Sequence, residues 1–280
     1  MRSKLLKSMA AHLGAGEDEL RKRIEVVDAA YSVFRIPKRR GFRRIEAPRP
    51  WLKTIQRFLL DHYLVHLPVH LASHAFCRER SIFSHACRHA DRKWVVTVDI
   101  HKFFPSVKRS MLERLPHELG LNQGDGELLL DLVTRKGHLP QGAPTSPHLG
   151  NLVLRDLDQH LETAALEHAW NYSRYADDLV ISGDENPQAM LAELKRAVSS
   201  AGFSVNPAKC RIMGQHQRQW VTGLVVNRGM KLPRDQRRLL RAVEHRMRNG
   251  LLEGDSLALR GQIAFRDFAL RQEQALLDKI

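Results

Sequence analysis

Residues 171–183 read NYSRYADDLVISG, the most informative segment of the chain. Its apolar and β-branched residues on either side of YADD (175–178) predict a hairpin over 172–182 whose bend carries two adjacent aspartates, Asp177 and Asp178. Neighbouring carboxylates repel each other, and a bound divalent cation is the simplest means of keeping both ionised near neutral pH. The bend is therefore a candidate cation site.

A third carboxylate lies at the end of another predicted strand. Residues 94–100 read WVVTVDI, and their β-branched content indicates a buried strand that ends near Asp99. Burying a carboxylate costs several kcal/mol of folding free energy unless another group compensates for it. A role as a turn former could explain Asp178, but it explains Asp99, at the end of a buried strand, poorly. Oxygen ligands suit Mg²⁺, and two such ions about 3.5–4 Å apart can clamp the oxygens of a phosphoryl transfer. Two Mg²⁺ ions are expected here, with Mn²⁺ as the alternative ion.

The charge of the chain indicates a polyanionic partner. The 280 residues include 45 Lys and Arg but only 31 Asp and Glu, which gives a net charge of +14. Nucleic acid is the first candidate and an anionic membrane surface the second. No apolar run approaches the roughly 20 residues of a spanning helix, and the N-terminus has no apolar signal core, so a cytoplasmic protein without membrane contact is expected.

The remaining pattern alternates helices and strands in the order of an α+β fold. A basic stretch over 35–57 contains four prolines or glycines and stays largely outside regular helix. Periodicity predicts helices over roughly 1–30, 51–66, 110–118, 126–134, 146–169, 187–201 and from 233 onward, and strands over 43–47, 94–100, 203–205, 209–213 and 221–226 beside the hairpin.

Five segments between residues 35 and 227 resemble the motifs of reverse transcriptases, and they follow one another along the chain in the order found in that family. YADD resembles their YxDD box, and residues 98–106 (VDIHKFFPS) resemble their first catalytic segment. The others are a fingers motif around RRI (43–45) and LKTIQ (52–56), the helix-opening motif LPQGAPTSP (139–147) and GFSVNPAK (202–209). The resemblance implies a right-hand polymerase fold with fingers over 1–93, a palm over 94–227 that contains an inserted fingers segment around 110–145, and a basic thumb over 228–280.

The resemblance also implies roles for single residues in an RNA-directed DNA polymerase that uses dNTPs. Asp99, Asp177 and Asp178 would be the metal ligands, and Lys209 would protonate or neutralise the leaving pyrophosphate, unless it is simply a solvated lysine. Phe104 matches the steric gate against ribose, with a core aromatic as the alternative. Arg43, or Arg44 in its place, would grip the triphosphate. Template, nucleotide and nucleic-acid contacts would come from Gln141, Gly142, His89, Gly223, Arg234, Arg237, Arg238, Arg241 and Arg246.

Two further segments resemble retron enzymes in particular. VTG (221–223) matches their characteristic triplet, and HACRH (85–89) is similar to their NAxxH segment, with His85 in place of Asn. The resemblance implies a cognate structured non-coding RNA, a DNA product primed from an RNA 2′-OH, and antiphage defence with a separate effector protein. The alternatives are an abortive-infection or group II intron-like enzyme and a catalytically silent RNA-binding relative.

Overall fold

The computed structural model describes residues 3–38 and 41–249, together with residues 261, 264, 265, 267, 268 and 271. These residues fold as two compact units, each assembled from segments that lie far apart in the sequence. Unit 1 comprises Met1–Leu71, Ile100–Gln159 and Ala201–Ser204, and unit 2 comprises Ala72–Asp99, His160–Ser200 and Val205–Ile280. The expected boundaries of fingers, palm and thumb stay a prediction.

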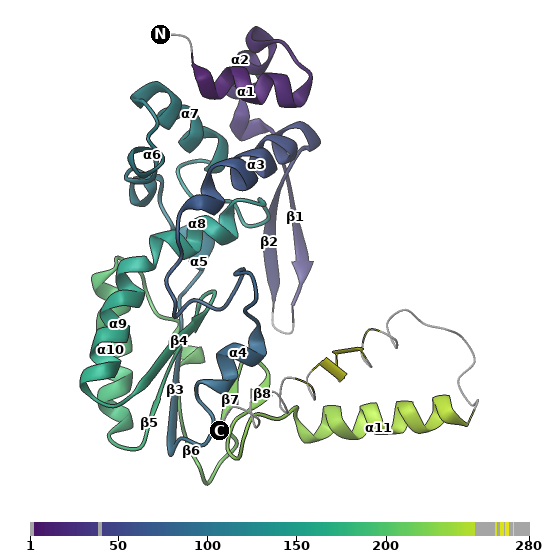
Figure 1. Ribbon diagram of the computed structural model, residues 1–280, viewed down its shortest axis with the longest axis vertical. Coiled ribbons are helices and arrows are strands. Elements are labelled where there is room, and N and C mark those ends of the chain that lie inside the picture. Colours follow the sequence, from purple (N-terminus) through teal and green to yellow (C-terminus); the bar gives the residue numbers. More distant parts are fainter. Residues whose placement is uncertain are drawn as a thin grey trace. The chain divides into compact units, whose positions relative to one another are not determined.

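Unit 1 contains helices and one long hairpin (Figure 1). The first helix begins where the Ser3 side chain accepts a hydrogen bond from the Leu6 amide, and it ends at Gly14, whose φ of 65° suits glycine. The elements are α1 (Lys4–Leu13), α2 (Glu17–Glu25), β1 (Tyr31–Pro37), β2 (Phe42–Pro48), α3 (Pro50–His62), α5 (Phe103–Ser106), α6 (Leu115–Glu118), α7 (Gln123–Val133) and α8 (Ser146–Val153); α9 (Arg155–Glu167) starts in unit 1 and ends in unit 2.

Unit 2 is built on a four-stranded antiparallel sheet with the order β4-β5-β3-β6. The predicted hairpin forms its β4–β5 edge, and the predicted buried strand is β3 at its centre. Its elements are α4 (Ile82–Cys87), β3 (Trp94–Asp99), β4 (Asn171–Tyr175), β5 (Asp178–Gly183), α10 (Pro187–Ser200), β6 (Arg211–Gly214), β7 (Trp220–Val221), β8 (Leu224–Val225) and α11 (Arg234–Arg248).

Both faces of this sheet are covered. Helix α10 packs on β3 and β5 on one face, as Figure 1 shows. On the other face a core cluster joins Val95 and Val180 of the sheet to Phe83 of α4 and to Val221 and Leu224 of the β7–β8 hairpin. Because side chains alternate along a strand, Asp99 and Asp178 project on the same face as Val95 and Val180.

Tertiary contacts correct three of the predicted elements. The single helix expected over 146–169 breaks at Leu154, where the freed carbonyl of Leu152 accepts hydrogen bonds from the side chains of Arg114 and Arg155. Residues 203–205 form a single bridge at Val205 rather than a strand: the carbonyl of Ser204 accepts from the amide of His101 at 2.7 Å, and the amide of Asn206 donates to the carbonyl of Asp99 at 2.8 Å. The strand expected over 221–226 is instead a short hairpin.

Three other differences are smaller. The strand expected over 209–213 is β6 (Arg211–Gly214), and Lys209 lies in the 3-10 turn before it. Residues 110–118 form a 3-10 turn and the short helix α6 rather than one helix. Strand β1 was not predicted, because all but its first residue are exposed and no apolar alternation marks it. None of the described helices is long and apolar enough to cross a membrane.

Candidate active site

The antiparallel register of β3 and β5 sets Asp99 directly opposite Asp178. Side chains at opposed positions have Cβ atoms about 4.5–5.5 Å apart and point to the same face. Asp177 precedes Asp178 in the bend that joins β4 to β5. Pairing of the strands therefore gathers three carboxylates from two distant parts of the sequence at one end of the sheet.

A buried arginine holds the bend in shape. Ala176 has a φ of 57°, which is the left-handed region that non-glycine residues seldom occupy. Its carbonyl accepts a hydrogen bond of 2.9 Å from Nη1 of Arg174, whose residue has no exposed surface. A guanidinium fixed inside the protein thus stabilises a strained backbone directly beside Asp177.

Asp99 is fastened to the segment that contains Lys209. Its backbone carbonyl accepts from the amide of Asn206 at 2.8 Å, and its Oδ1 accepts from Asn206 Nδ2 at 3.3 Å. Its Oδ2 accepts from Nζ of Lys209 in an ion pair. The Asp99 residue is buried, whereas 55% of the Lys209 side chain is exposed, so the ammonium can reach both the carboxylates and solvent.

Mutual repulsion marks the electrostatics of the cluster. Enclosure by protein, and then the charge of Asp99, raise the pKa of Asp177. Enclosure and the charges of Asp177 and Asp99 raise the pKa of Asp178 to about 7, although its side chain still reaches solvent. Burial alone would lower the pKa of Lys209, but its hydrogen bond to Asp99 and the nearby carboxylates raise it. The site is short of positive charge near neutral pH.

The donor set suits hard divalent cations. A bound cation would relieve the repulsion that raises the pKa of Asp177 and Asp178, and oxygen-only ligands fit Mg²⁺ or Mn²⁺. Among the residues that the structure describes, no three His, Cys, Asp or Glu side chains are arranged as a ready-made cation cage. The ammonium of Lys209 forms an ion pair with Asp99.

Three buried histidines, here called the histidine row (His74, His85 and His89), lie beside the bend. His89 bonds through both ring nitrogens, to Ser182 Oγ at 2.8 Å and to Ser173 Oγ at 2.7 Å. Nδ1 of His85 lies 3.3 Å from Thr222 Oγ1, and its ring centroid lies 5.8 Å from that of Tyr175. The HACRH segment and the VTG hairpin thus meet behind the YADD bend, with Gly223 (φ 85°) at the exposed tip.

Burial keeps the histidine row uncharged. It lowers the pKa of His74 to about 4 and that of His85 to about 3, and it lowers the pKa of His89 well below its usual value. Neighbouring arginines, Arg88 among them, act in the same direction. The row is therefore a neutral hydrogen-bonding support. The predicted nucleic-acid contact by His89 is not available in this conformation, because its residue has no exposed surface.

In unit 1 the helix-opening motif lies against strand β2. The carbonyl of Gln141 accepts a hydrogen bond of 2.8 Å from the amide of Glu46. Gly142 has a φ of 133°, and a Cβ there would come within 3.1 Å of the Glu46 carbonyl and 3.0 Å of Ile45 Cγ2. Only glycine allows β2 to pass so closely. Gln141, Gly142 and the arginines of β2 are thereby held in one substructure.

The other predicted nucleotide contacts also lie in unit 1. The Phe104 ring is half-buried, 5.2 Å from that of Phe103, and lies beside Gly150 of α8, whereas Phe103 itself is buried and packs on Phe203. Phe103 thus supplies the core aromatic of this pair. Arg44 forms an ion pair with Glu46 at 3.2 Å, and Arg43 is exposed on the neighbouring position of β2.

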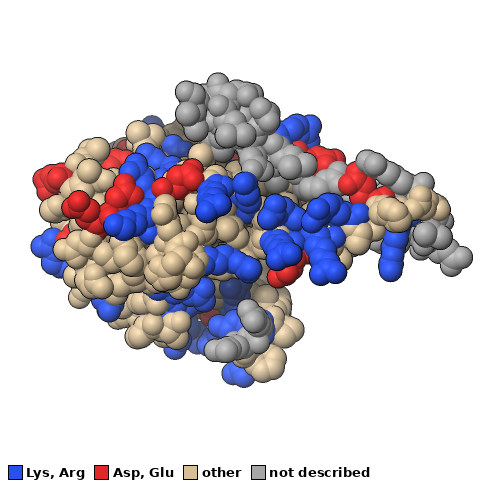
Figure 2. Space-filling model, turned by 90° about the horizontal axis from the view of Figure 1, so that it is seen from below, with Lys and Arg blue, Asp and Glu red and all other residues tan. Residues whose placement is uncertain are grey.

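Helix α11 carries the basic residues predicted to contact nucleic acid. Arg234, Arg237, Arg238, Arg241 and Arg246 are all exposed. Figure 2 shows Lys and Arg side chains gathered over the part of the molecule that carries this helix. Met247 and Arg248 at the end of the helix, and most of the residues beyond Asn249, lie outside the described side chains.

The sequence patterns gave no role to Arg174, Asn206 or Thr222, which the structure brings to the carboxylates or their support. One signal for Arg174 was present, because a cation inside the otherwise uncharged strand NYSRY requires a partner. Asn206 and Thr222 lie within the GFSVNPAK and VTG motifs, but no local pattern indicates what they bond to, since their partners lie more than 100 residues away.

Comparison with known families matches residues 36–225 to the model of the reverse transcriptase (RNA-dependent DNA polymerase) family. The chain is 38% identical to the retron Mx162 reverse transcriptase of Myxococcus xanthus, over 85% of this chain and 58% of the relative. It is 36% identical to the retron Mx65 enzyme of the same organism, over 84% and 60%, and 31% identical to the retron Ec86 enzyme of Escherichia coli, over 75% and 67%. The chain thus spans about three fifths of the length of the first two relatives.

Solved structures share the fold at much lower identity. The foamy viral protease–reverse transcriptase in complex with double-stranded DNA matches with a TM-score of 0.53 and 14% identity, over 89% of this chain and 39% of that one. Telomerase from Candida albicans in complex with a fragment of telomeric RNA matches with a TM-score of 0.52 and 13% identity, over 88% and 54%. The chain therefore belongs to the reverse transcriptase family, is of the retron type, and has the right-hand polymerase fold.

Proposed function

We propose that this chain is an RNA-directed DNA polymerase whose reaction centre is the carboxylate cluster of unit 2. The observation that carries the proposal is the register that opposes Asp99 and Asp178, with Asp177 beside them and Lys209 bonded to Asp99. Two divalent ions, when bound by these carboxylates, would stabilise the charge that develops on the attacking and leaving oxygens. Mg²⁺ is the ion that the oxygen donors favour.

The protein side chains supply the remaining functions. Lys209 keeps its proton, because nearby carboxylates raise its pKa, and it can neutralise or protonate a leaving pyrophosphate. The half-buried ring of Phe104 would exclude a ribose 2′-OH. Arg43, whose neighbour Arg44 is already paired with Glu46, would bind the triphosphate of an incoming dNTP. Gln141 and Gly142 would lie under the template–nucleotide pair, and the arginines of α11 would contact the nucleic-acid backbone.

The finer proposal concerns the RNA. The VTG hairpin and the names of the relatives support a retron enzyme that copies part of a cognate structured non-coding RNA, priming from an RNA 2′-OH. His85, which replaces the Asn of the NAxxH segment, still reaches Thr222 of VTG and so retains a link between the two segments. A cytoplasmic role in antiphage defence with a separate effector protein completes this proposal.

Primer extension on an RNA template tests the polymerase. Purified protein with Mg²⁺ and dNTPs should extend a DNA primer with a sequence complementary to the template. Extension that ignores the template would favour an enzyme of the abortive-infection kind. Binding of RNA without any incorporation would favour the silent relative.

The retron assignment has its own test. Protein expressed with its native flanking locus should carry DNA joined to RNA through a 2′–5′ linkage. After RNase treatment, debranching enzyme should shift the mobility of the remaining DNA. DNA attached to protein, or no locus-encoded DNA, would overturn the retron proposal and leave the polymerase proposal standing.

A further inference from the structure

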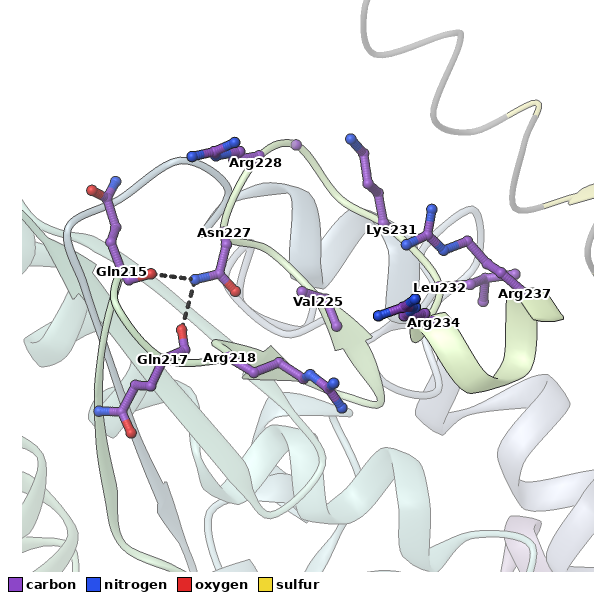
Figure 3. A pocket seen from close by; sticks show the side chains of 11 residues that line it. Gln215, Gln217, Arg218, Val225, Asn227, Arg228, Lys231, Leu232, Arg234 and Arg237 are labelled. Atoms are coloured by element: carbon purple, nitrogen blue, oxygen red, sulfur yellow. Dashed lines mark hydrogen bonds between the residues drawn. The ribbon is translucent and has the colours of Figure 1, made fainter.

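A pocket of about 460 Å³ lies in unit 2, away from the carboxylates, between the loop after β6, the segment after β8 and the start of α11. Figure 3 shows the side chains that line it, with those of Arg218 and Arg234 extending toward each other. Its lining consists of Gln215, Gln217, Arg218, Val225, Asn227, Arg228, Gly229, Lys231, Leu232, Arg234 and Arg237.

The wall of the pocket is fixed by hydrogen bonds. Nδ2 of Asn227 donates to the carbonyls of Gln215 and Gln217 at 3.1 and 2.7 Å (Figure 3), and its Oδ1 accepts from the amide of Gln219 at 2.8 Å. The backbones of Val225 and Lys231 exchange two hydrogen bonds of 2.8 Å. The loops that present the charged residues are therefore held in a defined arrangement.

Five cations and no acidic residue line this pocket. The cations are Arg218, Arg228, Lys231, Arg234 and Arg237, all exposed, and none of them forms an ion pair within the described part of the chain. Several arginines of unit 1, by contrast, are paired with carboxylates. Arg109 pairs with Glu127 and Asp131, Arg114 with Glu118 and Asp156, and Arg155 with Glu118.

A concentration of like charge on fixed loops raises the free energy of the protein unless an anion compensates for it. Guanidinium groups bind phosphate oxygens in pairs, and several cations around one hollow can contact consecutive phosphates. Arg218 is further held over the Trp220 ring, 5.3 Å from its centroid. A single small anion would satisfy only part of this set.

We infer that this basic pocket binds consecutive backbone phosphates of a nucleic-acid strand, through Arg218, Arg228 and Lys231 in addition to the arginines of α11. The inference rests on the proposed function for the source of the strand, an RNA or its DNA copy. It adds an anchor that lies outside the α11 helix and away from the bend that carries the carboxylates. Binding there would be insensitive to base sequence and sensitive to salt.

The test replaces the three cations outside α11 together, as Arg218→Gln, Arg228→Gln and Lys231→Gln. The matched control is Lys7→Gln, Arg21→Gln and Lys195→Gln, three exposed residues that lie elsewhere and have no ion pair within the described chain. Both triple variants lose three charges. Fluorescence anisotropy with a labelled RNA stem–loop, and with a DNA duplex of equal length, is measured across a salt series without Mg²⁺ or dNTPs, with tripolyphosphate as the competing free anion.

The slope of log affinity against log salt should become shallower by about 2 to 3 in the pocket variant, because each phosphate contact contributes about 0.7–0.9. The control should retain the slope of the original protein. Equal changes in both variants would reduce the effect to net charge and overturn the inference. The inference would also be overturned if the pocket variant lost binding of tripolyphosphate but bound both nucleic acids as the original protein does.

Two further measurements separate the outcomes. If the triple variant does not melt cooperatively, Arg228→Gln alone should reduce the slope by about 0.7–0.9. Primer extension by the original protein is assayed independently. If the original protein extends primers but the pocket variant keeps the original salt slope of binding, the inference fails and the proposed function stands. If the salt slope becomes shallower but the original protein extends no primer, the pocket inference stands and the proposed function fails.

Discussion

Unit 2 contains two places where charges of one sign crowd together, and they are built in opposite ways. The carboxylate cluster lies at the end of a buried sheet, and a buried arginine, an ion-paired lysine and three neutral histidines surround it. The cations of the basic pocket lie on exposed loops, and no described acidic side chain pairs with them. The carboxylates are held by hydrogen bonds and an ion pair at the end of a sheet, with Asp178 and Lys209 reaching solvent, whereas all the cations of the pocket are exposed.

The difference follows from what each cluster would bind. Chemistry at a phosphate requires ligand positions that are correct to a fraction of an ångström, and only buried, hydrogen-bonded surroundings supply such rigidity. A phosphate backbone of variable sequence requires only positive charge at suitable spacing. Loss of a single contact should therefore be severe at the carboxylates and graded at the pocket.

The largest effect is expected for Asp177→Asn and Asp178→Asn. Each removes the charge of a metal ligand with little change in volume, so primer extension should fall at least 1,000-fold, about 4 kcal/mol in the barrier. Folding should be retained, and relief of repulsion should raise the melting temperature without Mg²⁺. Glu185→Gln, an exposed residue near the other end of β5, is the control for charge. Near-normal extension by both Asn variants would disprove the metal-site assignment.

Arg174→Met tests whether the bend needs its buried support. The change leaves the Ala176 carbonyl without its 2.9 Å donor, which should destabilise the fold by about 2–3 kcal/mol. Chemical denaturation gives the stability, and kcat should fall more than KM changes, because the aspartates shift while the nucleotide contacts of unit 1 are untouched. The control Arg196→Met removes an exposed arginine and should lower neither the stability nor kcat. Normal kcat in a stable Arg174→Met protein would show that the bend maintains its own shape.

The histidine row predicts that stability falls in acid. The folded-state pKa values of His74 (about 4) and His85 (about 3) lie below the value of about 6.5 in the unfolded chain, so their contribution is complete above pH 6.5 and is lost as pH falls toward 4. At pH 5, keeping His85 neutral costs about 2 kcal/mol, or roughly 4–8 °C in melting temperature. His85→Asn should lessen this fall, and His66→Asn, on an exposed residue, should not. Identical pH profiles would contradict the assignment.

Phe104→Ala changes neither charged cluster and should have the smallest effect. Removing the ring should improve the use of rNTPs relative to dNTPs by about tenfold, which corresponds to about 1.4 kcal/mol. Competition between rNTP and dNTP in single-nucleotide extension measures the ratio. Phe103→Leu, at the buried neighbour, should lower stability without altering the ratio. An unchanged ratio in an active Phe104→Ala protein would place the gate elsewhere.

Local pattern was sufficient for most elements of the fold. The hairpin around YADD, the buried strand that ends at Asp99 and the amphipathic helix over 187–201 all formed close to their predicted bounds. Alternation, β-branched content and helical periodicity depend on neighbours a few residues apart, which a single sequence displays. The break at Leu154 was missed; one of the side chains that bond to the Leu152 carbonyl there is Arg114, which lies about 40 positions away in the sequence.

Residue type and order were enough to identify the family, to single out Asp99, Asp177 and Asp178 as candidate metal ligands and to give the positive charge of the chain. Tertiary structure alone decided that Asp99 faces Asp178, that Asn206 and Lys209 fasten to Asp99, and that Arg174 holds the bend. It also decided which cations remain without partners and surround one pocket. These facts depend on strand register and on packing between segments up to about a hundred residues apart, and no local preference of the chain encodes such distances.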